Sequence, residues 1–143
     1  MQLTIVFEKN NTTGAYYIIG VADNPVSADS IAAISLSKGR MYSAYTESYS
    51  YNSSLDRTCY VVYPRNNWID KSVREKVDPK RIFGKMYYSG DHPTAADIKI
   101  YKTEDSAVKK AATIVDDIVD PGYEHKDDVV GEYVNIRLND PVY

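Results

Sequence analysis

The segment from Lys71 to Lys85, with the tyrosines that follow it, carries the residue types best suited to holding a phosphorylated ligand. The segment has six basic residues and two acidic ones, a net charge of +4. Arginine forks match phosphate oxygens, and aromatic rings stack on nucleobases. The residues we expect to hold a phosphorylated small molecule or nucleotide are Arg74, Lys80, Arg81, Tyr87 and Tyr88. The alternative is a solvated charged helix and loop that pairs with the acidic C-terminal part of the chain.

Tyrosine provides the second candidate site, because the chain has 14 tyrosines against two phenylalanines and one tryptophan. Tyrosine combines an apolar ring with a polar tip, which suits wet binding surfaces. The predicted strand 41–51 is aromatic on one face and small on the other, which favours an edge strand that displays tyrosines to a protein partner or a second copy of the chain. The alternative is that the rings pack over their own sheet with their hydroxyls in solvent. The predicted partner-binding residues are Tyr42, Tyr45, Tyr49 and Tyr51.

Signatures of catalysis are incomplete. The single cysteine, Cys59, lies in the apolar stretch TCYVVY, where we expect an inert packed thiol. His92-Pro93-Thr94 is a His-x-Thr triplet, of which two-histidine phosphoesterases use two, but His125 is followed by Lys126-Asp127. No glycine-rich phosphate loop and no metal-ligand spacing occurs in the sequence. We therefore predict no catalytic residues, no cofactor and no metal, with an enzyme of unrecognised type as an alternative.

Composition predicts one globular domain over residues 1–143. The net charge of −3 and the pI of about 5.3 argue against non-specific nucleic-acid binding. Charge is uneven, because residues 103–143 hold ten acidic and four basic residues. No apolar run is long enough to span a membrane, and the opening residues lack the pattern of a secretory signal. We expect a cytoplasmic protein, in the host cytoplasm if its source is viral.

The clearest strand-then-helix pattern covers residues 98–122. Ile98 and Ile100 alternate with polar residues, as in a half-buried strand. Apolar residues then recur at spacings of three and four, which predicts one long amphipathic helix over 103–119. Thr103 is the expected N-cap, and Asp120-Pro121-Gly122 the expected stop.

The remaining chain predicts an α+β fold, mainly antiparallel sheet, with one or two shorter helices besides the long one. Strands are expected at 3–7 and 15–22, where Gly20 marks a bulge or a close approach, and at 58–63, where Pro64 ends the strand. Two further strands are expected at 82–89 and 129–138. A helix is expected over 27–38 with Ser27 as its N-cap, the alternative being a buried strand over 31–36, and another helix within 65–78. We find no internal repeat in the sequence.

These features favour a non-enzymatic binding protein that acts through a tyrosine-rich, partly acidic surface. Small acidic domains without motifs are often accessory or inhibitor proteins of phages and mobile elements. A protein that sequesters a nucleotide or another phosphorylated small molecule through residues 71–85 is the alternative, and an enzyme without a recognisable motif is the third interpretation.

Overall fold

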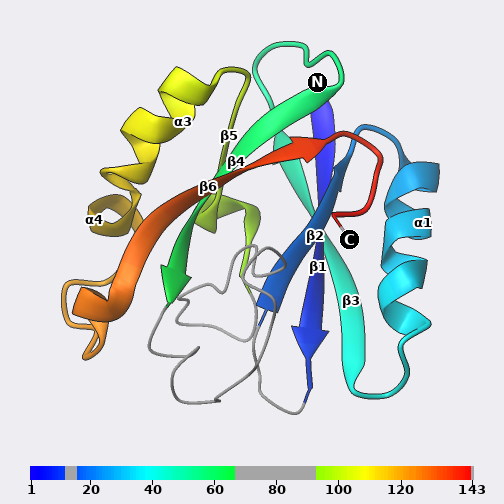
Figure 1. Ribbon diagram of the computed structural model, residues 1–143, viewed down its shortest axis with the longest axis horizontal. Coiled ribbons are helices and arrows are strands. Elements are labelled where there is room, and N and C mark those ends of the chain that lie inside the picture. The colour runs from blue at the N-terminus through cyan, green and yellow to red at the C-terminus, as the bar shows by residue number, and fades with distance from the viewer. Residues whose placement is uncertain (12–15, 67–92, 143) are drawn as a thin grey trace.

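The computed structural model describes residues 1–11, 16–66 and 93–142, and within them it forms two three-stranded antiparallel sheets (Figure 1). The first sheet has the order β2-β1-β3, from β1 (Gln2–Asn10), β2 (Tyr16–Ala22) and β3 (Tyr42–Ser50). The second has the order β5-β4-β6, from β4 (Thr58–Asn66), β5 (Lys99–Tyr101) and β6 (Val129–Arg137). The predicted α+β class is confirmed.

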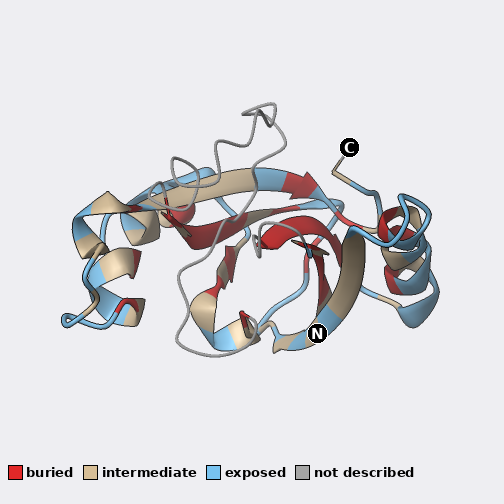
Figure 2. Ribbon diagram, turned by 90° about the horizontal axis from the view of Figure 1, so that it is seen from below, coloured by how far each residue is buried: buried red, intermediate tan, exposed pale blue. Residues whose placement is uncertain are grey.

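Helices cover the outer faces of both sheets. α1 (Pro25–Leu36) packs on the first sheet, and α3 (Glu104–Ala111) with α4 (Ile114–Ile118) packs on the second, at the opposite side of the molecule (Figure 1). The short 3-10 turns η2 (Ala95–Asp97) and η3 (Lys126–Asp128) precede β5 and β6. The main core lies between the sheets, where buried strand faces meet (Figure 2). Its fully buried large side chains are Leu3, Ile5, Phe7, Ile18, Val21, Val61 and Ile98.

Each half of the chain builds its sheet in the same order. In the first half β1 lies in the middle, β2 returns beside it, α1 crosses the outer face and β3 pairs with the other edge of β1. In the second half β4, β5, the pair α3 and α4, and β6 take the same four places. The middle strands β1 and β4 have the same length and the same burial class at every position. Within the described residues the fold therefore repeats a β-β-α-β unit, a structural repeat that is not visible as an internal repeat in the sequence.

The two helices also share a short sequence pattern. Val21 of β2 and Ile100 of β5 stand at the same register position against their middle strands, and a helix begins four residues after each of them. Both helices then contain Ser-Ala-x-x-x-Ala-Ala, at 27–33 and 106–112. A buried alanine in this pattern lets each helix lie close on its sheet. These buried alanines are Ala28 and Ala107.

The helix predicted over 27–38 is confirmed, but its N-cap is Asn24 and not Ser27. The Asn24 side chain accepts a hydrogen bond from the Ser27 backbone N–H at 2.8 Å. Pro25 follows at the first helical position, where its missing N–H costs nothing. After α1, Gly39 adopts a φ of +102°, a conformation that glycine tolerates best.

The long helix predicted over 103–119 is wrong, because it is broken into α3 and α4 by a turn at residues 112–113. Thr103 caps α3 as predicted, accepting from the Ser106 N–H at 3.4 Å. At the break, both the N–H and the hydroxyl of Thr113 donate to the Lys110 carbonyl, at 3.0 and 3.3 Å. This local bonding competes with the helical pattern. Ile114, the first residue of α4, is fully buried against β4 and β6.

Gly20 fulfils both roles predicted for it. The register of β1 with β2 slips beside Gly20, as in a β-bulge. A Cβ at Gly20 would lie 2.7 Å from Cδ1 of Ile31 in α1, so the glycine also permits close helix packing. In contrast, Pro64 does not end its strand, since β4 continues to Asn66. In the described part of the chain, β4 is paired on one side only at Pro64, because its pairing with β5 ends at Val62.

Gly131 of β6 gives a direct test of the close packing of α3 on the second sheet. A Cβ at Gly131 would overlap the carbonyl oxygen of Ala111 and lie 2.8 Å from its carbonyl carbon. Because the neighbour is backbone at the end of α3, we expect Gly131→Ala to lower the free energy of unfolding by about 1–3 kcal/mol. Urea denaturation followed by circular dichroism would measure this change.

The matched control is Gly122→Ala, whose Cβ would meet only the Asp120 side chain, at 3.4 Å. We expect that variant to unfold within about 0.5 kcal/mol of the wild type. Equal stability of the two variants would show that α3 does not press on β6 at Gly131.

Candidate functional site

The candidate site lies at the seam between the two sheets, where β3 faces η2 and β5. In the described part of the chain, β3 pairs with β1 and β5 with β4, and side chains bridge the gap between them. The Tyr45 hydroxyl donates to the Pro93 carbonyl at 2.7 Å, and the Glu47 carboxylate accepts from the Ala95 N–H at 3.3 Å. The Tyr49 hydroxyl accepts from the Ile100 N–H at 3.0 Å. Alternate side chains of one β3 face thus join the two halves, and we call this row the tyrosine seam.

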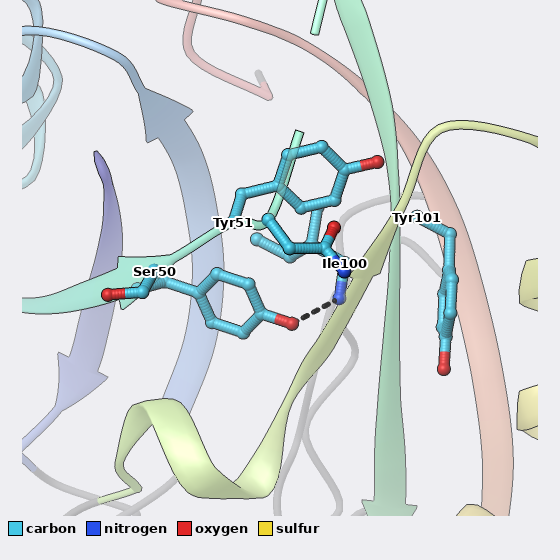
Figure 3. A pocket seen from close by; sticks show the side chains of 6 residues that line it. Ser50, Tyr51, Ile100 and Tyr101 are labelled. Carbon is cyan, nitrogen blue, oxygen red and sulfur yellow. Dashed lines mark hydrogen bonds between the residues drawn. The ribbon is translucent and has the colours of Figure 1, made fainter. Parts of the chain in front are cut away.

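At one end of the tyrosine seam a pocket of about 260 Å³ opens (Figure 3). It is lined by Tyr49, Ser50, Tyr51, Asn52, Ile100 and Tyr101, and we call it the seam pocket. Its volume lies just below the roughly 300–1,000 Å³ of pockets that hold drug-sized ligands. The rings of Tyr49 and Tyr51 offer apolar walls, while hydroxyl and amide groups offer hydrogen bonds. The Tyr101 ring lies on the other face of β5, where it packs against the cluster of Val62, Ala107 and Ile114 (Figure 3). The pocket therefore suits one or two side chains of a partner, or a small planar group.

Tyr49 stays neutral at physiological pH. Burial raises the pKa of its phenol above the ordinary value of 10.0, the hydrogen bond from the Ile100 N–H acts in the opposite direction, and the neighbouring Tyr101 and Tyr51 raise it further. Its oxygen accepts the Ile100 bond, so the phenol can still donate its own proton to a bound group. Tyr49 therefore acts in the pocket as a hydrogen-bonding group and not as a phenolate nucleophile.

The structure separates the four predicted partner-binding tyrosines. Tyr45, Tyr49 and Tyr51 pack against the core between the sheets, as the alternative interpretation expected, but two of their hydroxyls bond the segment 93–100 and not solvent. Tyr45 stacks on Phe7 with 4.9 Å between ring centroids. Tyr42 stands apart, with the Lys38 ammonium 5.3 Å from its ring centroid. Contact of these residues with a partner stays a prediction.

Four pocket residues were not predicted from the sequence. Tyr101 and Ile100 were identified as strand residues only, and the polar Ser50 and Asn52 read as the end of a strand and a turn. The pocket depends on placing β3 beside β5, which no local pattern reveals. The residues predicted to hold phosphate all lie outside the described part of the chain; they are Arg74, Lys80, Arg81, Tyr87 and Tyr88.

Cys59 has the properties of a packed thiol. It is fully buried on β4, and burial raises its pKa from 9.0 to about 12. Nucleophilic cysteines need a lowered pKa and access to solvent, so this thiol is not suited to catalysis. Among residues 1–11, 16–66 and 93–142, no three histidine, cysteine, aspartate or glutamate side chains gather as a metal site would require. None of the helices in those ranges is both long and apolar enough to cross a membrane.

Negative charge gathers on the helical layer of the second half. α3 and α4 carry four acidic residues, whereas α1 in the equivalent place carries one. The side chains of Asp116, Asp117 and Glu124 are 83%, 50% and 87% exposed. α3 also carries Lys109 and Lys110, so the net charge of α3 and α4 together is −2, against −1 for α1. Asp117 pairs with Lys110, and Asp116 pairs with Lys126.

Comparison with known proteins gives no further guidance, since no family model, no curated protein and no solved structure matches this chain.

The bridging role of Tyr49 can be tested by Tyr49→Phe, which removes only the hydroxyl. The Ile100 N–H would lose its acceptor at a residue that is 3% exposed. An unpaired buried N–H costs about 1–3 kcal/mol, so unfolding should become easier by that amount in urea titrations. Tyr42→Phe is the control, because its ring can keep the contact with Lys38, and it should change stability by less than about 0.5 kcal/mol. Equal effects of the two changes would refute a structural role for the Tyr49 hydroxyl.

Cys59 predicts an alkaline loss of stability. The thiol releases its proton at about pH 9 in the unfolded chain but only near pH 12 in the folded one, so above pH 9 the folded state binds more protons. The free energy of unfolding should fall as pH rises from 9 to 12, by a few kcal/mol at most. Cys59→Val, measured by denaturation at pH 8, 9, 10 and 11, should show a shallower fall. Identical slopes would mean that the thiol ionises equally in both states.

Proposed function

We propose that this chain is a non-enzymatic binding protein that recognises a protein partner through the seam pocket. The observation that carries this proposal is the pocket itself, which combines the rings of Tyr49 and Tyr51 with hydroxyl, amide and backbone groups. Aromatic residues with polar tips are enriched where proteins bind one another, and a partner's anchor side chain fits a pocket of this size. The raised pKa values of Tyr49 and Cys59 support binding rather than nucleophilic chemistry.

The acidic helical layer supports a partner with a basic surface. Exposed charges of one sign raise the rate at which an oppositely charged protein arrives, and they suppress wrong partners. Residues 103–143 hold ten acidic residues against four basic ones, and this excess of negative charge supports such a partner. An accessory or inhibitor protein of a phage or mobile element, working in the host cytoplasm, is the setting that we propose for such a binder.

A blocking substitution tests the proposal. Asn52 lines the seam pocket and is exposed, so Asn52→Trp should fill the pocket without disturbing the core. Ser54→Trp places the same side chain at an exposed position two residues away that does not line the pocket. Tagged wild type and both variants would be used to capture proteins from a lysate of the source cells, with enrichment quantified by mass spectrometry.

We expect one protein to be retained by the wild type and by Ser54→Trp, and to be lost with Asn52→Trp. Native mass spectra of the retained complex should show a fixed stoichiometry, and raised salt should weaken it. A captured set that is unchanged by Asn52→Trp would show that the seam pocket binds no partner. A small molecule, in place of a protein, in the native spectrum would equally contradict the proposal.

A further inference from the structure

The repeat supplies a second seam, between β6 and β2, that is closed in a different way. After β6 the segment 139–142 runs along the outer edge of β2, near the end marked C in Figure 1. The Asn139 N–H donates to the Val21 carbonyl and the Val142 N–H to the Ile19 carbonyl, both at 2.9 Å. Val142 also packs against the core between the sheets. Backbone hydrogen bonds and one aliphatic side chain therefore close this edge.

One shared hydrogen bond fixes the correspondence between the two seams. The Leu138 N–H donates to the Arg57 carbonyl at 2.7 Å, and the Tyr51 N–H donates to the Met1 carbonyl at 2.9 Å. Arg57 and Met1 each precede the middle strand of their half. Tyr51 is thus the counterpart of Leu138, and the residues after Tyr51 correspond to the segment 139–142.

In the tyrosine seam the residues that follow Tyr51 do not run along the neighbouring strand edge as the segment 139–142 does. Leu55, the counterpart of Val142, donates its N–H to the Met1 sulfur at 3.3 Å. Among the backbone hydrogen bonds of the described residues, neither Asn52 nor Leu55 donates to β5. The seam pocket opens at this place, and Ile100, the counterpart of Val21, lines it.

The edge of β5 that faces away from β4 has no paired strand among the described residues, and it presents a backbone acceptor to the seam pocket. The N–H and C=O of one strand residue point to the same side, and the Ile100 N–H points away from β4 towards Tyr49. The Ile100 carbonyl therefore faces the seam, as the Val21 carbonyl faces the segment 139–142. A strand edge that has no paired strand in ranges 1–11, 16–66 and 93–142, and that lies beside a side-chain pocket, is the arrangement used in recognition by strand addition.

We propose that the seam pocket accepts an extended peptide of a protein partner, which adds to the β5 edge. The peptide donates a backbone N–H to the Ile100 carbonyl, as Asn139 donates to the Val21 carbonyl of β2. It places an aliphatic side chain between the rings of Tyr49 and Tyr51, at the position that corresponds to Val142 beside β2. The segment 139–142 is not the occupant, because it is already held on the first half at β2, where the Asn139 side chain also accepts from the Asp23 N–H at 3.0 Å. This inference rests on the proposed function and narrows its partner to an extended segment.

A library of displayed random octapeptides tests the inference. Peptides would be selected on the wild-type protein and counter-selected on Asn52→Trp, with Ser54→Trp as the matched control. The best peptide would then be made with a single N-methyl group at each position in turn, and its Kd measured by titration. We expect one backbone position whose N-methylation weakens binding by about tenfold or more, because it removes the hydrogen bond to Ile100. Adjacent N–H groups point away from β5, and their methylation should have a smaller effect.

Amide spectra of the labelled protein supply a second readout, in which the bound peptide should shift Ile100, Tyr101 and Asn52. A selected peptide that tolerates N-methylation everywhere would overturn strand addition. If no peptide is selected but Asn52→Trp still abolishes capture of a protein from lysate, the proposed function stands and the extended-peptide inference fails. Concentration-dependent dimerisation that Asn52→Trp abolishes would assign the edge to a second copy of the chain and overturn the inference.

Discussion

The structure depends on covering the apolar sheet face and the two strand edges that each β-β-α-β unit leaves exposed. A three-stranded sheet with a helix on one face still has an apolar second face and two strand edges, and such a unit is too small to be stable alone. Here the two apolar faces cover each other, with residues such as Phe7 and Val61 at 0% exposure. One pair of edges meets through backbone atoms of the segment 139–142, and the other meets through the side chains of the tyrosine seam.

The high tyrosine content follows partly from the tyrosine seam. Phenylalanine could fill the same core volume, but it could neither donate to the Pro93 carbonyl nor accept from the Ile100 N–H. Tyr45 and Tyr49 have an apolar ring for the core and a polar tip that reaches the segment 93–100 of the other half. The same chemistry lines the seam pocket, so the feature that joins the two halves also prepares a place for a ligand.

Local signals in the sequence predicted much of the fold and little of the site. Alternation and apolar runs identified the described strands, and the spacing of apolar residues identified α1 although its N-cap was wrong, because these patterns act over a few residues. The continuous helix over 103–119 was wrong, since spacing alone does not show that Thr113 bonds the Lys110 carbonyl. The repeat was missed because the two units share burial and one short helical pattern and have few identical residues. The seam pocket could not be predicted, because Tyr51 and Ile100 meet only through pairing over long range.

The order of the units has a consequence for synthesis on the ribosome. The first sheet has all its partners by residue 50, because β3 completes the pairing with β1. At about 5–20 residues per second, the stretch up to residue 142 needs several more seconds to appear. During that interval the face that includes Phe7 has no second sheet to cover it, and the β2 edge stays uncovered until residues 139–142 have been made. The nascent chain thus passes through a period of exposed apolar surface and open strand edge, the condition in which holding chaperones bind.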